Sequence, residues 1–252
     1  MNDSPRFSAV RAAFLAFLFL GTPSHATAQD AGQQTPQIPI QIQRLTGPII
    51  FDGETTEPAW DEVSPFPLIQ YEPIYQGELT QRTQLRVAYD DDYLYDSCRC
   101  YETDPLLIQI TSLKRDNFNS RFDQVALLLD TFSNHENSLL FTISAAGVRT
   151  DATVTQEGAT YSASWNTLGG ATTQIGEEGW SAEYHIPLSS LNFYSDNGKT
   201  TMGLTMYRYI ARSNVTLMRF CVNHNESDNS SCVFNLCPLN RRVQTNKIHP
   251  HP

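Results

Sequence analysis

The sequence predicts an all-β protein: an antiparallel, jelly-roll-like β-sandwich with one short helical turn near Trp60. Two observations support this prediction. Apolar residues alternate with polar ones in many short segments, at the period of two that half-buried strands show. Gly, Pro, Asn and Asp separate these segments at short intervals, and few segments have the period of a helix. Such a pattern is typical of sandwiches built from antiparallel strands.

The clearest alternation lies in residues 83–101, TQLRVAYDDDYLYDSCRCY. In its first half, Leu85, Val87 and Tyr89 share one face, as the side chains of a strand do. Three aspartates then supply a polar turn, and the alternation resumes at Tyr93. We therefore expect a β-hairpin here, in the middle of a sheet.

The helical turn is expected directly before and at Trp60. Glu57 and Pro58 suit the first turn of a helix, where a missing N–H has no cost. A tryptophan on such a turn usually fills a core, so we expect Trp60 to be structural.

The N-terminus has the layout of a secretory signal peptide. Arg6 and Arg11 precede an apolar run at 12–20, and Ala26-Thr27-Ala28 offers a cleavage site between small residues. The run is well short of the roughly 20 residues of a spanning helix, and no later segment is long and apolar enough for one. We expect export, to a secreted, periplasmic or outer-membrane-associated location.

Four regions follow from these patterns: a signal peptide at 1–28, a flexible leader at 29–44, a sandwich domain at 45–218 and a disordered, atypical tail at 219–252. The tail reads as a truncated or out-of-frame ending, because it has no strand pattern and its Cys and His spacings fit no common zinc motif. Cys98 and Cys100 are two apart on one predicted strand, and we expect them to be small buried residues rather than a strained disulfide.

The charge balance limits which classes of binding partner are expected. The chain has 27 acidic and 17 basic residues, with a formal net charge of −10. This sign disfavours nucleic acid as a partner, because few cations are present to neutralise phosphates. It suits neutral ligands such as sugars, bound cations, or simply an acidic soluble surface.

Several motifs occur in an order that resembles carbohydrate-binding module family 9, in the divergent form found in secreted bacterial proteins. The match extends from about Ile50 to about Arg212. Its main pieces are Phe51-Asp52-Gly53, Glu57-Pro58-Ala59-Trp60, Leu85 to Asp91, Asp104-Pro105, Asp123 to Phe132, Gly147-Val148, Trp165, Gly179-Trp180 with Glu183, and Ile186-Pro187. Asp96 departs from the pattern, since relatives carry an apolar residue there and a carboxylate fits a buried face poorly.

The resemblance implies a sandwich that binds a polysaccharide or oligosaccharide, is attached to a glycoside hydrolase, and often holds structural calcium. In a large group of relatives a similar module precedes a long region that resembles an outer-membrane barrel, which makes such a barrel a partner in full-length relatives. No such region follows the module in this sequence, and we expect the family pattern to be truncated after about residue 218.

Sugar recognition needs an aromatic platform for the C–H face of a pyranose and polar groups for its hydroxyls. Trp165 lies in a polar stretch between predicted strands and is a candidate platform, with packing as the alternative. A second wall could come from Tyr71, Tyr75 or Tyr101, and Arg99 is a candidate hydroxyl donor.

Calcium needs several oxygen ligands, with carboxylates supplying the charge. Asp90, Asp91 and Asp92 in the hairpin turn are candidates, with a solvated turn as the alternative, and Asp123 before an apolar run is another. No catalytic constellation is visible, so catalysis stays open. The sequence predicts a secreted carbohydrate-binding module that supports carbohydrate breakdown. Its alternatives are a structural periplasmic domain without sugar affinity, or a glycosidase that hydrolyses O-glycosyl bonds.

Overall fold

A computed structural model describes residues 40–110, 113, 115, 122–134, 136–156, 160–196, 198–221 and 232–234, the last strand and residues 220–221 by backbone only. They belong to one compact unit, Pro36–Pro252. The predicted signal peptide lies outside the described residues, as do most of the leader and most of the tail. The described part of the chain contains no helix that would reach across a bilayer with an apolar surface.

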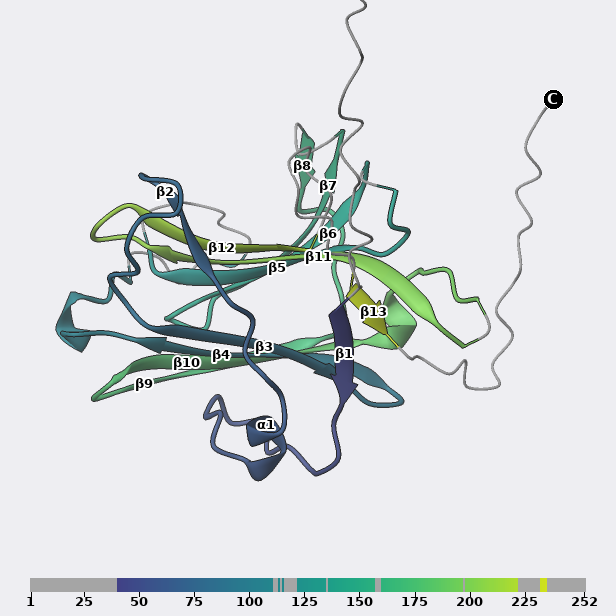
Figure 1. The fold of residues 1–252 in the computed structure, drawn as a ribbon, viewed down its shortest axis with the longest axis horizontal. Helices are drawn as coiled ribbons and strands as arrows, with labels where there is room; N and C mark the ends of the chain where they lie inside the picture. The colour runs from purple at the N-terminus through teal and green to yellow at the C-terminus, as the bar shows by residue number, and fades with distance from the viewer. Residues whose placement is uncertain are drawn as a thin grey trace, which may run out of the picture. The chain divides into compact units, whose positions relative to one another are not determined.

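Two layers of strands face each other (Figure 1). The first, sheet 1, contains in order β1 (Ile40–Arg44), β3 (Thr83–Tyr89), β4 (Tyr93–Tyr101), β10 (Gly179–Pro187) and β9 (Gly170–Gly176). The second, sheet 2, contains β2 (Ile69–Glu72), β12 (Val215–Cys221), β11 (Thr200–Ile210), β5 (Gln124–Asp130), β6 (Ser138–Ser144), β7 (Arg149–Thr155) and β8 (Thr160–Ser162). The short strand β13 (Cys232–Phe234) pairs with β11 and with β1, and so joins the layers.

Among the described strands most pairings are antiparallel, and only those of β1 with β3 and β13 are parallel. The helical segments are α1 (Pro58–Asp61) and two single 3₁₀ turns, Pro105–Leu107 and Leu188–Ser190. The predicted all-β sandwich with a helical turn at Trp60 is confirmed. So is the hairpin, since β3 and β4 pair in antiparallel register in the middle of sheet 1.

The core lies between the two sheets, because one side of each strand is apolar. Leu85, Val87 and Cys98 from sheet 1 meet Leu127 and Phe141 from sheet 2. Each such side chain stabilises the fold by roughly 1.5–3 kcal/mol when it is fully buried. Cys98 and Cys100 are both free and buried, as the sequence predicts.

Two predicted boundaries differ from the structure. The sequence predicts a flexible leader through residue 44, but β1 occupies its last five residues, Ile40–Arg44. It also predicts a disordered tail from 219, whereas β12 continues to Cys221 and β13 forms within the tail. The physical reason is pairing: short segments with a few apolar residues become strands when backbone partners such as β3 and β11 are available.

The outer side of sheet 1 is partly covered by the segment that contains α1 (Figure 1). Trp60 is 1% exposed and packs there with Val63 and Ala88. This placement agrees with the structural role predicted for Trp60. Beyond this cover, near the start of β3 and the end of β4, the outer side of sheet 1 carries the arginines described below.

Candidate functional site

Glu183 holds the covering segment against sheet 1. It lies in β10 between Ala182 and Tyr184, which face the core, so its own side chain points outward. One carboxylate oxygen accepts the Trp60 indole N–H at 3.1 Å, and the other accepts the backbone N–H groups of Asp52 and Gly53 at 3.2 and 3.1 Å. Burial raises the pKa of Glu183 to about 7, although these hydrogen bonds oppose the shift.

Gly53 makes this close approach possible. Its φ of +90° lies in the region that favours glycine, and a Cβ would lie 2.9 Å from the backbone of Thr173 in β9. The carbonyls of Gly53 and Asp52 accept hydrogen bonds from Ser181 and Gln174, at 2.7 and 3.4 Å. The loop at 52–56 is therefore fixed to β9 and β10 at several points.

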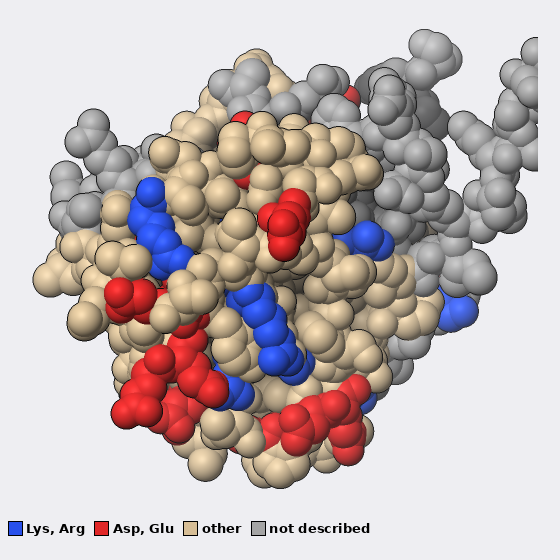
Figure 2. Space-filling view, turned by 60° about the vertical axis from the view of Figure 1, so that its left-hand side comes forward, with Lys and Arg blue, Asp and Glu red and all other residues tan. Residues whose placement is uncertain are grey.

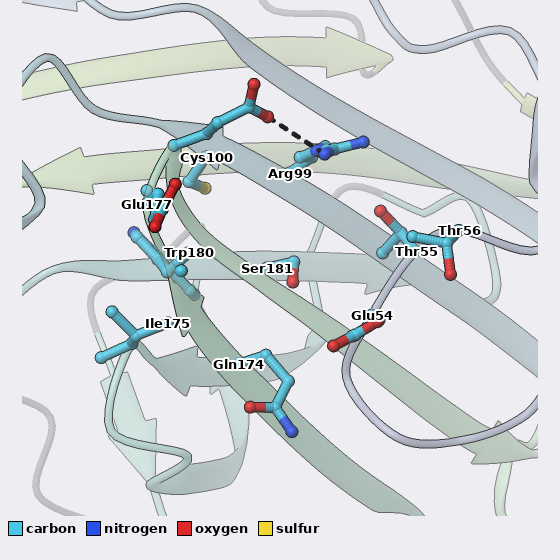
Figure 3. A pocket seen from close by; sticks show the side chains of 13 residues that line it. Glu54, Thr55, Thr56, Arg99, Cys100, Gln174, Ile175, Glu177, Trp180 and Ser181 are labelled. Atoms are coloured by element: carbon cyan, nitrogen blue, oxygen red, sulfur yellow. Dashed lines mark hydrogen bonds and ion pairs between the residues drawn. The ribbon is translucent and has the colours of Figure 1, made fainter.

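Between this loop and the β9–β10 turn lies a hollow of about 270 Å³, which we call the β9–β10 hollow (Figure 3). Glu54, Thr55 and Thr56 line one side, and the rest of the lining comes from Arg99-Cys100 of β4 and from residues 174–181. Ligand sites usually have volumes of about 300–1,000 Å³, so the hollow suits a small group such as one sugar unit.

Its polar lining can bind hydroxyl groups. Glu54, Thr56, Gln174 and Ser181 contribute carboxylate, hydroxyl and amide groups to this lining. Such groups can exchange hydrogen bonds with the hydroxyls of a ligand. Trp180 is in phase with Ala182 and Tyr184, so its indole belongs to the core. Arg99 donates to Glu178 at 3.2 Å, the ion pair drawn in Figure 3.

Two of the sequence-predicted sugar-binding residues lie together here. Arg99 lines the hollow, and Tyr101, two residues later in β4, lies beside it. The Cζ atoms of Arg82 and Arg99 lie 4.7 and 5.4 Å from the centre of the Tyr101 ring, within the range of cation–π contact.

The other three predicted aromatics, Trp165, Tyr71 and Tyr75, lie elsewhere. Trp165 is half-buried against the core, and its ring meets Phe141 edge to face at a centroid distance of 5.6 Å, which favours the packing alternative. Tyr71 lies in β2, at the edge of sheet 2, and meets Tyr75 edge to face at 6.2 Å. This exposed pair forms a second aromatic surface, and neither tyrosine lines the β9–β10 hollow.

The predicted calcium residues do not form a cluster. Asp90 accepts the backbone N–H groups of Asp92 and Tyr93 at 2.8 and 2.7 Å, and the Tyr95 hydroxyl at 2.8 Å, so it caps the hairpin turn. Asp91 pairs with Arg44 at 2.6 Å.

Asp123 precedes β5 in the other sheet and accepts the Gln109 N–H at 2.7 Å. Burial raises its pKa. It therefore contributes to sheet 2 and has no contact with the hairpin turn among the described interactions.

Only Asp52, Glu57 and Glu183 form a group of three potential metal-ligating side chains within the described ranges, with ligand atoms within 4.8 Å of one another. Both oxygens of Glu183 already accept N–H groups, and Glu57 and Asp52 each accept one backbone N–H. Calcium takes 6–8 oxygen ligands, so these residues do not make a calcium shell by themselves. Calcium stays a prediction from the sequence.

Arg82 and Glu54 are not among the site residues that the sequence predicts. Arg82 could have been found, because the alternation of β3 extends back one step and puts it on the same side as Gln84 and Arg86. Glu54 could not have been found from the sequence, because its loop is fixed by hydrogen bonds to Glu183, which lies about 130 positions later in the chain.

No protein-family model and no curated protein matches the sequence. Solved structures do resemble the fold. A family 9 carbohydrate-binding module from Caldicellulosiruptor kristjanssonii in complex with cellotriose has a TM-score of 0.52 and 18% identity, and covers 85% of this chain and 100% of its own. The same kind of module in complex with glucose has a TM-score of 0.53 and 18% identity, with 82% and 100% covered.

A further crystal structure, of a proposed carbohydrate-binding protein from Bacteroides uniformis, has a TM-score of 0.56 and 11% identity. It covers 77% of this chain and 97% of its own. At these identities the likeness establishes the fold. The chain has the β-sandwich fold of family 9 carbohydrate-binding modules.

Proposed function

We propose that this protein is an exported carbohydrate-binding module that holds a polysaccharide or oligosaccharide for an associated glycoside hydrolase. The observation that carries the proposal is the β9–β10 hollow, which has the volume of a small ligand group such as one sugar unit and a lining of polar side chains. Structures of the same fold in complex with cellotriose and glucose support this ligand class. The signal-peptide pattern at 1–28 supports export.

The test is isothermal titration of the purified protein with glucose, cellobiose and xylobiose. Gly176→Phe is the blocking variant, because a Cβ at Gly176 meets open space and the larger side chain would fill the hollow without strain. We expect saturable binding in the native protein and at least a tenfold loss in Gly176→Phe, since about 1.4 kcal/mol corresponds to tenfold.

The matched control is Tyr71→Ala, which removes part of the other aromatic surface. Loss of binding in this control alone would move the site to the Tyr71–Tyr75 pair. If a demonstrably folded sample binds none of the sugars, a structural domain without sugar affinity explains the protein better.

A further inference from the structure

A cluster of arginines surrounds Tyr101 on the outer side of sheet 1. Arg86 in β3 and Arg99 in β4 project from this side, and Arg82 directly precedes β3 in the same phase. We call Arg82, Arg86, Arg99 and Tyr101 the arginine cluster. Figure 2 shows basic side chains near the centre of the face that it brings forward, with acidic side chains above them and at the lower left and lower right.

Positive charge is in excess within this cluster. Arg99 pairs with Glu178, whose side chain is 71% exposed, and Arg82 makes no ion pair among the described residues. Arg86 donates to the Val63 carbonyl at 2.9 Å rather than to a carboxylate. Burial lowers the pKa of Arg86, Tyr101 and Asp61 raise it, and the nearby charges of Arg99 and Arg82 lower it. Among the described residues, Arg99 is thus the one member of this cluster in an ion pair, on a chain of net charge −10.

The backbone under the cluster is fixed from the inside of the sandwich. Arg208 of β11 is fully buried and donates to the carbonyls of Arg82 and Tyr101 at 3.3 and 3.2 Å, and to the Thr83 hydroxyl at 2.8 Å. Its charge is matched by Glu102. These contacts fix the backbone of Arg82 and Tyr101, whose side chains meet on the outer side of sheet 1. Ligand binding therefore costs little additional conformational entropy.

Resting on the proposed function, we propose that the arginine cluster binds the anionic group of an acidic saccharide while the β9–β10 hollow takes its sugar ring. Arg99 belongs to both, so one ligand can reach both. A guanidinium presents a planar fork of N–H donors that matches a carboxylate, and the cation–π contact with Tyr101 leaves these donors free to bond. A uronic acid or a sulfated sugar would supply the anion.

The experiment is isothermal titration of the full protein with a uronic-acid disaccharide, its neutral counterpart and a sulfated disaccharide, at low and high salt. We expect an acidic sugar to bind about tenfold more tightly than the neutral one at low salt, and the advantage to shrink at high salt as the charges are screened. Whichever acidic sugar shows this advantage identifies the anion.

Arg82→Gln should reduce the ratio of acidic to neutral affinity at least fivefold, roughly the effect of losing one charge-assisted hydrogen bond. Arg44→Gln is the matched control, because Arg44 is an exposed arginine of sheet 1 that pairs with Asp91 away from the cluster, and it should leave the ratio unchanged. Equal affinities for acidic and neutral sugars, or an unchanged ratio in Arg82→Gln, overturn the inference. Absence of binding by every sugar instead overturns the proposed function on which it rests.

Discussion

Two groups of arginines lie on opposite sides of the same strand ends. Inside the sandwich, Arg208 and Arg212 share the carboxylate of Glu102, and the side chains of Arg208 and Glu102 are fully buried. Outside, Arg99 is the member of the arginine cluster that forms an ion pair among the described residues, with the exposed Glu178. The inner group joins β11 of sheet 2 to the ends of β3 and β4, whereas the outer group lies on the solvent side of sheet 1.

The difference follows from solvation. A buried charge without a partner costs several kcal/mol, so the inner arginines keep their carboxylate and their carbonyl acceptors. Water screens the outer charges, so an excess of them costs little and stays available to a ligand. Chemically identical side chains therefore stabilise the fold on one side and can recognise a ligand on the other.

The largest expected effect is on the inner group. Glu102→Gln leaves the Arg208 charge buried without its counter-ion, and we expect a loss of about 3–5 kcal/mol in the free energy of unfolding, measured by urea denaturation. Arg82→Gln, on the outer side of sheet 1 just before β3, should change the free energy of unfolding by less than about 0.5 kcal/mol. Similar losses in both variants would contradict the division between the two groups.

The buried carboxyl group of Asp96 extends the comparison to an acidic residue inside the sandwich. Asp96 of β4 faces the core at 7% exposure, and one of its carboxylate oxygens has no hydrogen-bond partner among the described residues. Burial raises its pKa from 3.8 to about 7. The folded protein therefore holds this proton more tightly than the unfolded chain does, so its stabilising effect is complete below pH 4 and is lost as the pH rises towards 7.

The pKa difference at Asp96 corresponds to at most roughly 4 kcal/mol. We expect Asp96→Asn to flatten the decline in unfolding free energy between pH 4 and pH 7, while Asp92→Asn, on the exposed hairpin turn, leaves it unchanged. A slope that is the same in native protein and Asp96→Asn would show that Asp96 does not titrate in this range. Glu183, whose pKa is also raised to about 7 by burial, would account for the remaining slope.

A smaller effect is expected where Glu183 holds the covering loop. Glu183→Gln weakens the acceptor of three N–H groups, so we expect a loss of about 1–3 kcal/mol in unfolding free energy and weaker binding of neutral sugars. The control is Glu178→Gln on the neighbouring exposed turn, with a stability change below about 0.5 kcal/mol. Unchanged sugar affinity in Glu183→Gln would separate the loop from the binding site.

The smallest effect is expected from calcium removal. The carboxylates of Asp52, Glu57 and Glu183 supply too few free oxygens for a calcium shell. We therefore expect the unfolding temperatures in calcium chloride and in EDTA to agree within about 2 °C, a difference of less than about 1 kcal/mol. A larger stabilisation by calcium would contradict this expectation and support the calcium prediction made from the sequence.

The sequence predicted those strands and turns whose residues carry the signal themselves. The alternation in residues 83–101 predicted β3 and β4, and the turn before Trp60 predicted α1. The strand β1 was missed although Ile40 and Ile42 alternate with Gln41 and Gln43, because the segment is short and follows a Pro-containing polar stretch, and its partners β3 and β13 complete it. The site was only partly predictable: Arg99 and Tyr101 were identified, whereas the loop with Glu54 is positioned by Glu183, far away in the sequence.

The most direct test of the outer site is a nitrogen-15 NMR titration that follows the three tryptophan indole N–H groups and the arginine Nε–H groups as cellobiose or a uronic-acid disaccharide is added. The account predicts that Arg99 shifts with both sugars and Arg82 with the acidic one, while Trp60 and Arg208 stay unchanged because Glu183 and Glu102 hold them. Shifts confined to Trp165, or no shift at all in a folded sample, would contradict it.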